Sequence, residues 1–585
     1  MRTIQTPVLV VGAGPAGLVT SLTLAHHGVA SLLVEKHPGT SIHPRATGLS
    51  VRTMEVFRGL GIEAAVRSSS VDAAPLMHIS PTLTGPTVRV IPLGFPTTEQ
   101  AAAVSPTTAV ISPQDHVEPA LVARILELGL TDLRFATELV SFDQDAHGVT
   151  AVIRDVASGD ETRVEARYLV GADGGRSPVR EALGIEPVGP TGLEHHASFL
   201  FRSPGLLARL GDRRFALYMV GGPGLPSGVL LPMDPDDRWV YAAMGSQPVL
   251  QGLLASPEAA VGAIRAVAGV PDLEVELLAS MPLEFAAQLA PTWRLGRAFL
   301  AGDAAHRMPP IGGRGMNTAV ADAANLGWKL AWVASGFAAD SLLDTYEAER
   351  LPIARRNLSM PLSRYPEQAA ASGFELDVPA GVPPEGTPDG LLEDIGYRYA
   401  SSATTVDGDD PSPGIADGLA GSRAPHAWTQ VDGRAVSTVD LASGELRLVT
   451  AGDACGWRRS AGALSAGRHL LRGLASLVQA TGPDPLPPLV VLSIGTELAD
   501  PDGSLASAFG ISSGGAVLIR PDGHVAARWA TRPDDRRVAL ASALAAVTGY
   551  AAPARRTSVT GTKAGTPSSE SARSWTRMWS QPRSN

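Results

Sequence analysis

The chain has 585 residues, of which 44% are hydrophobic and 18% charged, a composition typical of a globular protein with two or three domains. The net charge of −10 argues against a nucleic-acid-binding surface. The single cysteine, Cys455, excludes an internal disulfide and a cysteine-based metal cluster, and we expect no metal site. No uninterrupted apolar run of about 18 residues occurs, so we expect no membrane contact. The near absence of cysteine leads us to expect a cytoplasmic location.

The N-terminal segment is predicted to form a βαβ unit. The short apolar run Pro7–Val11 is typical of a buried strand, and Ala16–His27 has helical spacing that ends before Gly28. A second strand is expected at Ala30–Glu35. A unit of about 30 residues of this kind is the context in which a Gly-x-Gly-x-x-Gly motif binds a dinucleotide.

Three glycines occupy the turn between that strand and that helix. Gly12, Gly14 and Gly17 permit a tight turn, close approach of the backbone to a pyrophosphate and close packing of the helix. The positive end of the helix dipole would then face the phosphates. Glu35 ends the second strand, where its carboxylate can accept hydrogen bonds from ribose hydroxyls. We therefore predict dinucleotide binding and not an incidental glycine turn.

The middle of the chain is predicted to add two helices and a sheet. Helices are expected at Thr47–Leu60 and Asp115–Leu130, and the intervening Ser68–Pro106 is expected to cross into a second layer. Successive strands bounded by glycine and proline follow at His195–Arg202, Arg214–Gly221, Ser227–Met233 and Arg238–Met244. Strand alternation would direct some of their aromatic side chains toward a substrate, and most into a core: Phe199, Phe201, Phe215, Tyr218, Trp239 and Tyr241.

Two further motifs each follow a predicted strand. Gly171-Ala-Asp173-Gly174 comes after Tyr168–Val170, although Asp-Gly is also common in simple turns. The second motif, Gly302-Asp303-Ala-Ala-His306, follows the apolar Ala298–Ala301, where an aspartate can accept a hydrogen bond from a ligand hydroxyl.

A run of glycines separates that second motif from a predicted helix at Asn317–Ala334. Gly312, Gly313 and Gly315 let backbone N–H groups approach a flat ring closely. The N-terminus of the helix would stabilise negative charge on a ligand bound there. Another helix is expected at Asp340–Arg350.

The C-terminal part is predicted to be a separate α/β module. The Pro379–Pro388 segment is expected to be a linker, and from Ala551 the composition predicts disorder. Between them we expect four strands, Leu446–Thr450, Leu489–Ser493, Ala516–Arg520 and His524–Trp529, and two helices, Ser465–Thr481 and Arg537–Thr548.

The three glycine-rich motifs together resemble the single-component FAD-dependent aromatic hydroxylases, the p-hydroxybenzoate hydroxylase and phenol hydroxylase group, and within it the actinobacterial enzymes that tailor aromatic polyketides. The resemblance implies an α/β fold with a Rossmann-like FAD-binding domain, an inserted substrate-covering β-sheet domain and a C-terminal thioredoxin-like domain. The corresponding ranges are 1–75 with 105–190 and 285–375, then 76–104 with 191–284, then 395–550, which lacks a Cys-x-x-Cys pair, followed by a disordered tail at 551–585.

The resemblance also implies which residues contact a non-covalent FAD. Arg45, in His43-Pro44-Arg45-Ala46, matches a position near both FAD and the nicotinamide nucleotide, with a solvated arginine after a turn as the alternative. The implied cofactor-binding residues are Gly12, Gly14, Pro15, Ala16, Gly17, Glu35, Lys36, Arg45, Gln114, Asp173, Asp303, Pro310, Gly313, Gly315, Met316 and Asn317.

The sequence identifies no catalytic side chain, because the flavin that the resemblance implies would supply the chemistry. Arg45 and His306 are secondary candidates, and His306 lies inside the FAD motif, which favours a structural role. Trp328 and Lys329 continue the resemblance and are expected to be structural. Cys455 has no dithiol partner and is expected to be buried and inert.

The resemblance implies a monooxygenase in which NADPH or NADH reduces FAD and O₂ forms a flavin C4a-hydroperoxide that gives one oxygen atom to a substrate. The sequence has no second Gly-x-Gly-x-x-Gly motif, so the reductant is expected to dock transiently on the FAD domain. Only three of the 48 basic residues are lysines, which indicates a GC-rich bacterial genome. This origin, together with the third domain, favours a polycyclic aromatic polyketide substrate in secondary metabolism.

Several alternatives stay open on the sequence. They are simple phenol hydroxylation, Baeyer–Villiger oxygen insertion at a polyketide ketone, and a non-catalytic FAD-binding pathway partner; a homodimer is also left open. A flavin halogenase is disfavoured because neither Gly-Trp pair, at Trp328 or Trp457, continues into the Gly-Trp-x-Trp-x-Ile-Pro signature.

Overall fold

A computed structural model describes residues 2–43, 46–234, 237–376, 390–405, 414–415, 417–442, 444–452, 454–475, 487–500 and 503–550. The predicted linker Pro379–Pro388 and the predicted disordered tail at 551–585 lie outside these residues. None of the described helices combines the length and the apolar character needed to cross a membrane.

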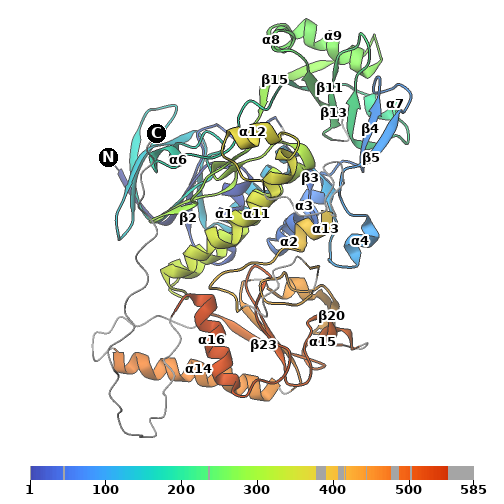
Figure 1. The fold of residues 1–585 in the computed structure, drawn as a ribbon. Helices are drawn as coiled ribbons and strands as arrows, with labels where there is room; N and C mark the ends of the chain where they lie inside the picture. Colours follow the sequence, from blue (N-terminus) through green and yellow to red (C-terminus); the bar gives the residue numbers. More distant parts are fainter. Residues whose placement is uncertain are drawn as a thin grey trace, which may run out of the picture. The chain divides into compact units, whose positions relative to one another are not determined.

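The predicted βαβ unit forms the middle of an eight-stranded sheet (Figure 1). The strand order is β17-β18-β10-β1-β2-β7, and β9 and β8 extend it from β10 as an antiparallel hairpin. β1, β2, β7, β10 and β18 are parallel, so their carboxyl ends meet at one edge. The strand bounds are β1 Arg2–Val11, β2 Ser31–Val34, β7 Thr131–Arg134, β8 Thr137–Gln144, β9 Val149–Asp155, β10 Glu161–Gly171, β17 Arg294–Leu295 and β18 Ala298–Leu300.

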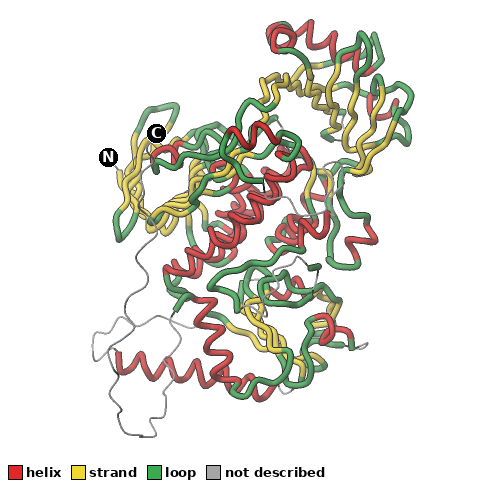
Figure 2. The backbone as a smooth tube through the Cα atoms, viewed as in Figure 1, coloured by secondary structure: helices red, strands yellow, loops and turns green. Residues whose placement is uncertain are grey.

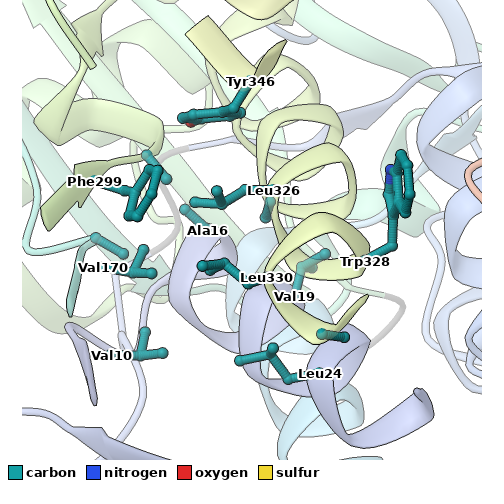
Figure 3. Close-up of a cluster of buried hydrophobic side chains, with 14 of the residues drawn as sticks. Val10, Ala16, Val19, Leu24, Val170, Phe299, Leu326, Trp328, Leu330 and Tyr346 are labelled. Carbon is teal, nitrogen blue, oxygen red and sulfur yellow. The ribbon is translucent and has the colours of Figure 1, made fainter. Parts of the chain in front are cut away.

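Helices cover this sheet because its strands are apolar on both faces. Figure 3 shows Leu326 and Leu330 of α10 on the side of Val170 and Phe299 of the sheet, with Val19 of α1 in the same buried cluster. The longer helices are α1 Pro15–His26, α2 Val51–Gly59, α5 Gln114–Leu128, α10 Arg314–Ala334 and α11 Asp344–Leu362. Shorter helices are α3 Glu63–Ser68, α4 Thr98–Ala102, α6 Pro178–Ala182, α12 Pro366–Ala371 and α13 Gly390–Ile395, with 3₁₀ turns at Gly302–Ala304, Ile311–Gly313 and Asp340–Leu343.

The predicted helix Thr47–Leu60 is wrong at its start. Gly48–Leu49 form a short strand, β3, paired with β6 (Val110–Ile111), and α2 begins only at Val51. The physical reason is a cap: the Ser50 side chain accepts a hydrogen bond from the Thr53 backbone N–H and fixes the helix start there. In contrast, α10 begins at Arg314, earlier than the predicted Asn317.

A second sheet has seven strands in the order β15-β11-β14-β13-β12-β4-β5. The predicted crossing of 68–106 into a second layer is confirmed, since β4 and β5 form one edge of this sheet. Its strands are β4 Ala74–Ser80, β5 Arg89–Pro92, β11 Glu194–Arg202, β12 Phe215–Val220, β13 Ser227–Pro232, β14 Arg238–Met244 and β15 Glu276–Phe285; the associated helices are α7 Leu206–Arg209, α8 Gln247–Ala255 and α9 Pro257–Ala268.

The C-terminal module is built on a four-stranded sheet in the order β23-β22-β24-β25. Figure 2 shows strands and helices together in this module. β22 and β23 are parallel, while β24 and β25 are antiparallel to their neighbours. The elements are β20 Trp428–Val431, β21 Arg434–Ser437, β22 Leu446–Ala451, α14 Ala454–Ala475, β23 Leu489–Ile494, α15 Ser504–Ala508, β24 Ala516–Ile519, β25 Val525–Trp529 and α16 Arg536–Thr548, with a 3₁₀ turn at Thr438–Ala442.

Two predictions for this module are corrected by the structure. α14 starts at Ala454 and not at Ser465, and the predicted end of that helix at Thr481 lies outside the described residues. Cys455 is exposed and not buried, because it lies in the first turn of α14 while the neighbouring Trp457 fills the core position.

Candidate active site

A cavity of about 2310 Å³ is lined by both larger sheets. The carboxyl ends of β1, β2 and β10 and the start of α10 line one part, and one face of the seven-stranded sheet lines the other. Cavities that hold one drug-sized ligand are typically about 300 to 1,000 Å³. This cavity is therefore large enough for a dinucleotide and a second, sizeable ligand.

The glycines after β1 differ in what a side chain would meet. A Cβ at Gly12, which has φ +101°, would lie 2.3 Å from the Ala172 carbonyl oxygen, and one at Gly17 would lie 1.8 Å from the Gly12 carbonyl oxygen. Both positions require glycine for packing. Gly14 lines the cavity, and a Cβ there would meet no atom within 4 Å. The structure therefore leaves open, beside the N-terminus of α1, the space in which a pyrophosphate would fit.

Glu35 lies at the carboxyl end of β2 and faces the same cavity. Its Oε2 accepts a hydrogen bond from the Ala13 backbone N–H at 2.9 Å, and its Oε1 accepts one from the His37 backbone N–H at 2.9 Å. A carboxylate can accept about four hydrogen bonds, so Glu35 retains capacity for a hydroxyl donor. These contacts hold the Glu35 carboxylate against the glycine turn.

The second glycine-rich segment opens onto the cavity at the start of α10. Gly313, with φ +63°, is the N-cap of α10, and no side chain caps this helix end. The first-turn N–H groups therefore have no side-chain acceptor, and their partial positive charge faces the cavity lining formed by Gly315 and Met316. A Cβ at Gly313 would meet no atom within 4 Å, which leaves room for a flat ring against the backbone.

Asn317 ties this segment to the loop before α2. Its Oδ1 accepts hydrogen bonds from the Ser50 backbone N–H at 2.9 Å and from the Thr53 hydroxyl at 2.7 Å. Its Nδ2 donates to the carbonyl oxygens of Gly48, at 2.9 Å, and Gly313, at 2.7 Å. The Asn317 amide thus positions two walls of the cavity relative to each other.

Asp173 also lines the cavity but has local partners. Its Oδ1 accepts a hydrogen bond from the Ser177 hydroxyl at 2.5 Å, and its Oδ2 accepts one from the Val179 backbone N–H at 2.9 Å. Burial raises the pKa of the Asp173 carboxyl. Gln114, at the start of α5, donates to Glu118 Oε1 at 2.7 Å, and burial likewise raises the pKa of Glu118.

The cavity brings together most of the residues that the sequence singled out for the cofactor. Those that line it are Gly12, Gly14, Pro15, Ala16, Glu35, Lys36, Gln114, Asp173, Asp303, Pro310, Gly313, Gly315, Met316 and Asn317. Gly17 packs behind the turn and does not line it. Arg45 lies outside the described residues.

His306 is not a candidate for proton transfer in this geometry. Its side chain is buried, does not line the cavity, and places Nε2 2.6 Å from Asp322 Oδ2. Asp322 Oδ1 in turn accepts a hydrogen bond from Arg350 Nε at 2.8 Å. This buried network joins β19 (His306–Arg307), which pairs with β16 (Gln288–Leu289), to α10 and α11, and this placement favours the structural role expected for His306.

The face that the seven-stranded sheet turns toward the cavity is largely apolar. On β12 the side chains of Leu217 and Met219 line the cavity, and on β14 those of Val240, Ala242 and Met244 do so. Methionine is concentrated there and around the start of α10: eight of the eleven methionines line the cavity, namely Met77, Met219, Met233, Met244, Met281, Met308, Met316 and Met360.

The aromatic residues of these strands face the other way. None of Phe199, Phe201, Phe215, Tyr218, Trp239 and Tyr241 lines the cavity among the described residues, so the expectation that some would face a substrate is wrong. They pack instead with residues of α9, such as Ile264 and Val267, in a separate core. Burying large rings between a sheet and its covering helices removes more apolar area from water than exposing them in a cavity.

Two polar clusters that were not predicted from the sequence interrupt the apolar face, both on β11. Glu194 and His196 are in contact, with His196 Nε2 3.0 Å from Glu194 Oε2, and the Tyr365 hydroxyl donates to Glu194 Oε1. Ser198 Oγ lies 3.3 Å from His43 Nε2. A signal was present: Glu194, His196 and Ser198 alternate along a strand whose next residues are apolar.

Comparisons with known proteins assign both parts of this architecture. Residues 5–360 match the FAD binding domain family, and residues 417–551 match the family "aromatic-ring hydroxylase, C-terminal". The chain is 37% identical to the tetracenomycin A2 monooxygenase-dioxygenase of Streptomyces glaucescens, over 93% of this chain and 97% of that enzyme. It is also 37% identical to the 4-methyl-5-nitrocatechol 5-monooxygenase of a Burkholderia species, over 93% and 98%.

The similarity extends to solved structures. The crystal structure of a ternary complex of aklavinone-11 hydroxylase with FAD and aklavinone superposes with a TM-score of 0.79 at 33% sequence identity. The match covers 93% of this chain and 99% of that one.

Proposed function

The chain belongs to the FAD-binding aromatic-ring hydroxylase family, and from this premise we propose that it hydroxylates a polycyclic aromatic polyketide at the expense of NADPH or NADH and O₂. FAD is its cofactor, as in the family. The substrate, the reductant and the residue roles below are our proposal.

One observation carries the substrate class: a single large cavity joins the glycine-lined part to a broad, methionine-rich sheet face. Methionine is unbranched and polarizable, so its side chain adapts to flat ring systems of different outline and makes favourable sulfur–aromatic contacts. A cavity of about 2310 Å³ suits FAD together with a multi-ring substrate better than FAD with a single ring. Names of relatives that act on tetracenomycin A2 and aklavinone agree with this choice.

When bound, FAD supplies the redox chemistry, taking two electrons from the nicotinamide nucleotide and passing one oxygen atom of O₂ to the substrate. The protein's own residues orient and shield it. The open space at Gly14 and the α1 N-terminus would hold the pyrophosphate, Glu35 the ribose, and Asp303 the ribityl chain. The N-terminus of α10 at Gly313 and Gly315 would stabilise negative charge on the reduced ring.

The predicted domain partition is retained as part of this proposal. The eight-stranded sheet and its helices would bind FAD, the seven-stranded sheet would cover the substrate, and the C-terminal module would be thioredoxin-like without redox chemistry. The nicotinamide nucleotide would dock transiently on the FAD-binding part, because the sequence carries no second dinucleotide motif.

A monocyclic phenol is the second candidate substrate. The 37% identity to a 4-methyl-5-nitrocatechol 5-monooxygenase favours it, since the identity equals that to the tetracenomycin A2 enzyme. The two candidates differ in how much of the methionine-lined face the substrate would cover.

Rapid mixing under anaerobic conditions tests the proposal. The FAD-loaded protein is mixed with NADPH or NADH, with and without hydroxylated anthraquinones, tetracyclic polyketides or simple phenols, and then exposed to O₂. Flavin bleaching stimulated by the polycyclic compounds, with a product heavier by one oxygen atom, is the expected result. Stimulation by phenols alone selects the second candidate, and ring-expanded lactone products indicate oxygen insertion. Absence of flavin reduction with either nucleotide refutes the monooxygenase proposal.

A further inference from the structure

We propose that His196 is the catalytic base that accepts the proton of a substrate phenol, and that Glu194 and Tyr365 position its imidazole for this task. The inference rests on the proposed function, because it names the group that prepares the substrate ring for hydroxylation. The inference goes beyond the proposed function because it assigns a chemical role in the reaction to a protein side chain.

His196 lies on the part of the substrate face that is nearest to the cofactor-binding elements. Tyr365, which contacts Glu194, follows α11, and His43, which contacts Ser198, follows β2; both belong to the chain segments around the eight-stranded sheet. The first half of β11 is therefore held against those segments by two polar contacts. His196 lies between these two contacts on the cavity-facing side of the strand.

The hydrogen bonding of the imidazole leaves one nitrogen available. Nε2 lies 3.0 Å from Glu194 Oε2, while Nδ1 is buried and has no hydrogen-bond partner. A carboxylate can only accept, so Nε2 carries the proton and Nδ1 presents a lone pair. The His196 side chain is only 6% exposed and stacks on Phe285, with ring centroids 4.5 Å apart.

A buried nitrogen without a hydrogen-bond partner, on a side chain that lines a cavity, indicates that a ligand supplies the partner. A buried polar atom without a partner costs about 1 to 3 kcal/mol, a cost that a hydroxyl donor in the cavity would remove. The register neighbours of His196 on β14 and β15, Met244 and Leu283, are apolar and give Nδ1 no hydrogen bond. The complementary group is a hydroxyl on an otherwise apolar, flat molecule, which is the description of a phenolic ring.

The proton-transfer step needs only the substrate phenol as proton donor and His196 as proton acceptor. The phenolic O–H bond breaks, an N–H bond forms at His196 Nδ1, and the resulting imidazolium is stabilised by the Glu194 carboxylate at Nε2. The phenolate oxygen then donates electron density to its ortho and para carbons, which makes them better nucleophiles toward the transferred oxygen atom. After transfer, the proton returns from Nδ1 to the phenolate oxygen of the product.

Tyr365 is suited to hold Glu194 without titrating. Burial and the hydrogen bond to Glu194 raise the pKa of the Tyr365 phenol to about 12, so it stays a neutral donor. Other titratable or charged groups that line the cavity on segments next to β11 include His43, Glu284 and Arg364. These groups could also contribute to a pH dependence, so variants at Glu194 and His196 are needed to separate their titration from that of His196.

The experiment uses alizarin, a dihydroxyanthraquinone whose absorbance moves to longer wavelength when its phenol ionises. Alizarin is titrated into the oxidised, FAD-loaded protein at a series of pH values. We expect bound alizarin to ionise about one pH unit below free alizarin in wild type, because a neighbouring base stabilises the charged pair. His196→Asn should abolish this shift, Glu194→Gln should reduce it, and Tyr365→Phe should reduce it least.

His195→Asn is the matched control. His195 is the adjacent residue on β11, is exposed and does not line the cavity, so this variant should keep the wild-type shift. Where a substrate has been identified, His196→Asn should also lower kcat about 100-fold with KM little changed. The loss of kcat should be smaller for more acidic phenols, which ionise without a base. Equal ionisation of alizarin in wild type, His196→Asn and His195→Asn would overturn the proposal, and so would binding to wild type without a shift.

The dye titration separates this inference from the proposed function. It needs no electron transfer, so a shift that depends on His196 supports the base even if no nicotinamide nucleotide reduces the flavin. If His196→Asn fails to retain FAD, the alizarin titration is made with Tyr365→Phe and Glu194→Gln instead. A wild-type ionisation shift in both of these variants then refutes the proposed role of Glu194 and Tyr365 in positioning His196.

Discussion

Arg520 of the C-terminal module and Glu349 of α11 form a fully buried, two-pronged ion pair. Arg520 Nη1 donates to Glu349 Oε1 at 2.6 Å and Nη2 donates to Oε2 at 2.9 Å, and both side chains have no exposed surface. The same carboxylate accepts hydrogen bonds from Asn325 and Lys329 of α10, the helix whose N-terminus faces the cavity. The C-terminal module is thereby anchored to the helix pair behind the proposed flavin site.

The first prediction concerns this anchor. Arg520→Met should lower the free energy of unfolding by about 3 to 5 kcal/mol, because it leaves a buried carboxylate with less compensating charge. Urea unfolding followed by tryptophan fluorescence measures the loss. The control is Arg458→Ala, which removes an arginine from an exposed pair with Glu497 and should cost less than about 1 kcal/mol. Equal effects of the two variants would contradict the anchoring role.

The second prediction is the pH dependence of the same contact. Burial alone would raise the pKa of Glu349, but the charges of Arg520 and Lys329 outweigh it and hold that pKa below its ordinary 4.5. The stability that ionised Glu349 contributes is therefore complete above pH 4.5 and is lost as the pH falls toward the lower folded value.

Glu349→Gln tests this sign. The variant should be about 3 kcal/mol less stable than wild type at pH 7, and the difference should shrink as the pH falls below 4.5. Denaturant midpoints measured from pH 7 to pH 3.5 give the two curves. Glu127→Gln, at an exposed carboxylate of α5, provides the control and should parallel wild type. A difference that widens toward acid pH would show the sign to be wrong.

The third prediction concerns Gly14. Gly14→Glu should abolish FAD retention, because the new side chain would extend into the open space proposed for the pyrophosphate and add negative charge there. The flavin absorbance of the purified protein measures retention. Gly252→Glu, at an exposed position of α8 that is also free of neighbours within 4 Å, should purify with full flavin content. A Gly14→Glu protein that keeps its flavin would refute the assignment.

The fourth prediction concerns Cys455. Because this thiol is exposed in the first turn of α14, it should react with a thiol-specific reagent in the native protein without denaturant. Cys455→Ser should nevertheless leave turnover within about twofold of wild type, since the thiol has no partner for redox chemistry. A tenfold loss, about 1.4 kcal/mol of barrier, would show a role in the reaction.

Much of the cofactor side of the cavity could be predicted from the sequence, because its determinants are local. The backbone of Gly12 needs positive φ, and Gly17 needs the absence of a Cβ beside a carbonyl oxygen, and both requirements are visible as glycines at fixed spacing. The carboxyl ends of parallel strands bring Glu35 and Asp173 to one edge without further information. Their contact with FAD stays a prediction.

The helix starts were less predictable because caps decide them. Ser50 fixes the beginning of α2 through its side chain, and Gly313 fixes that of α10 through its left-handed backbone, while the hydrophobic periodicity on which the predictions were based extends across both. Trp328 and Lys329 are buried and contact Asp522 and Glu349, which agrees with the structural role expected for them.

The sequence by itself determined that a βαβ unit with a dinucleotide turn begins this chain, since strand, turn and helix depend on residues close together. Only the tertiary structure decided which faces of the substrate sheet are buried. Alternation divides β11 into two faces, but the covering by α9 assigns Phe199 to the core and leaves His196 at the cavity. The alternation groups Glu194, His196 and Ser198 on one face, but which face meets a covering helix and which meets the cavity depends on packing between segments that are distant in sequence.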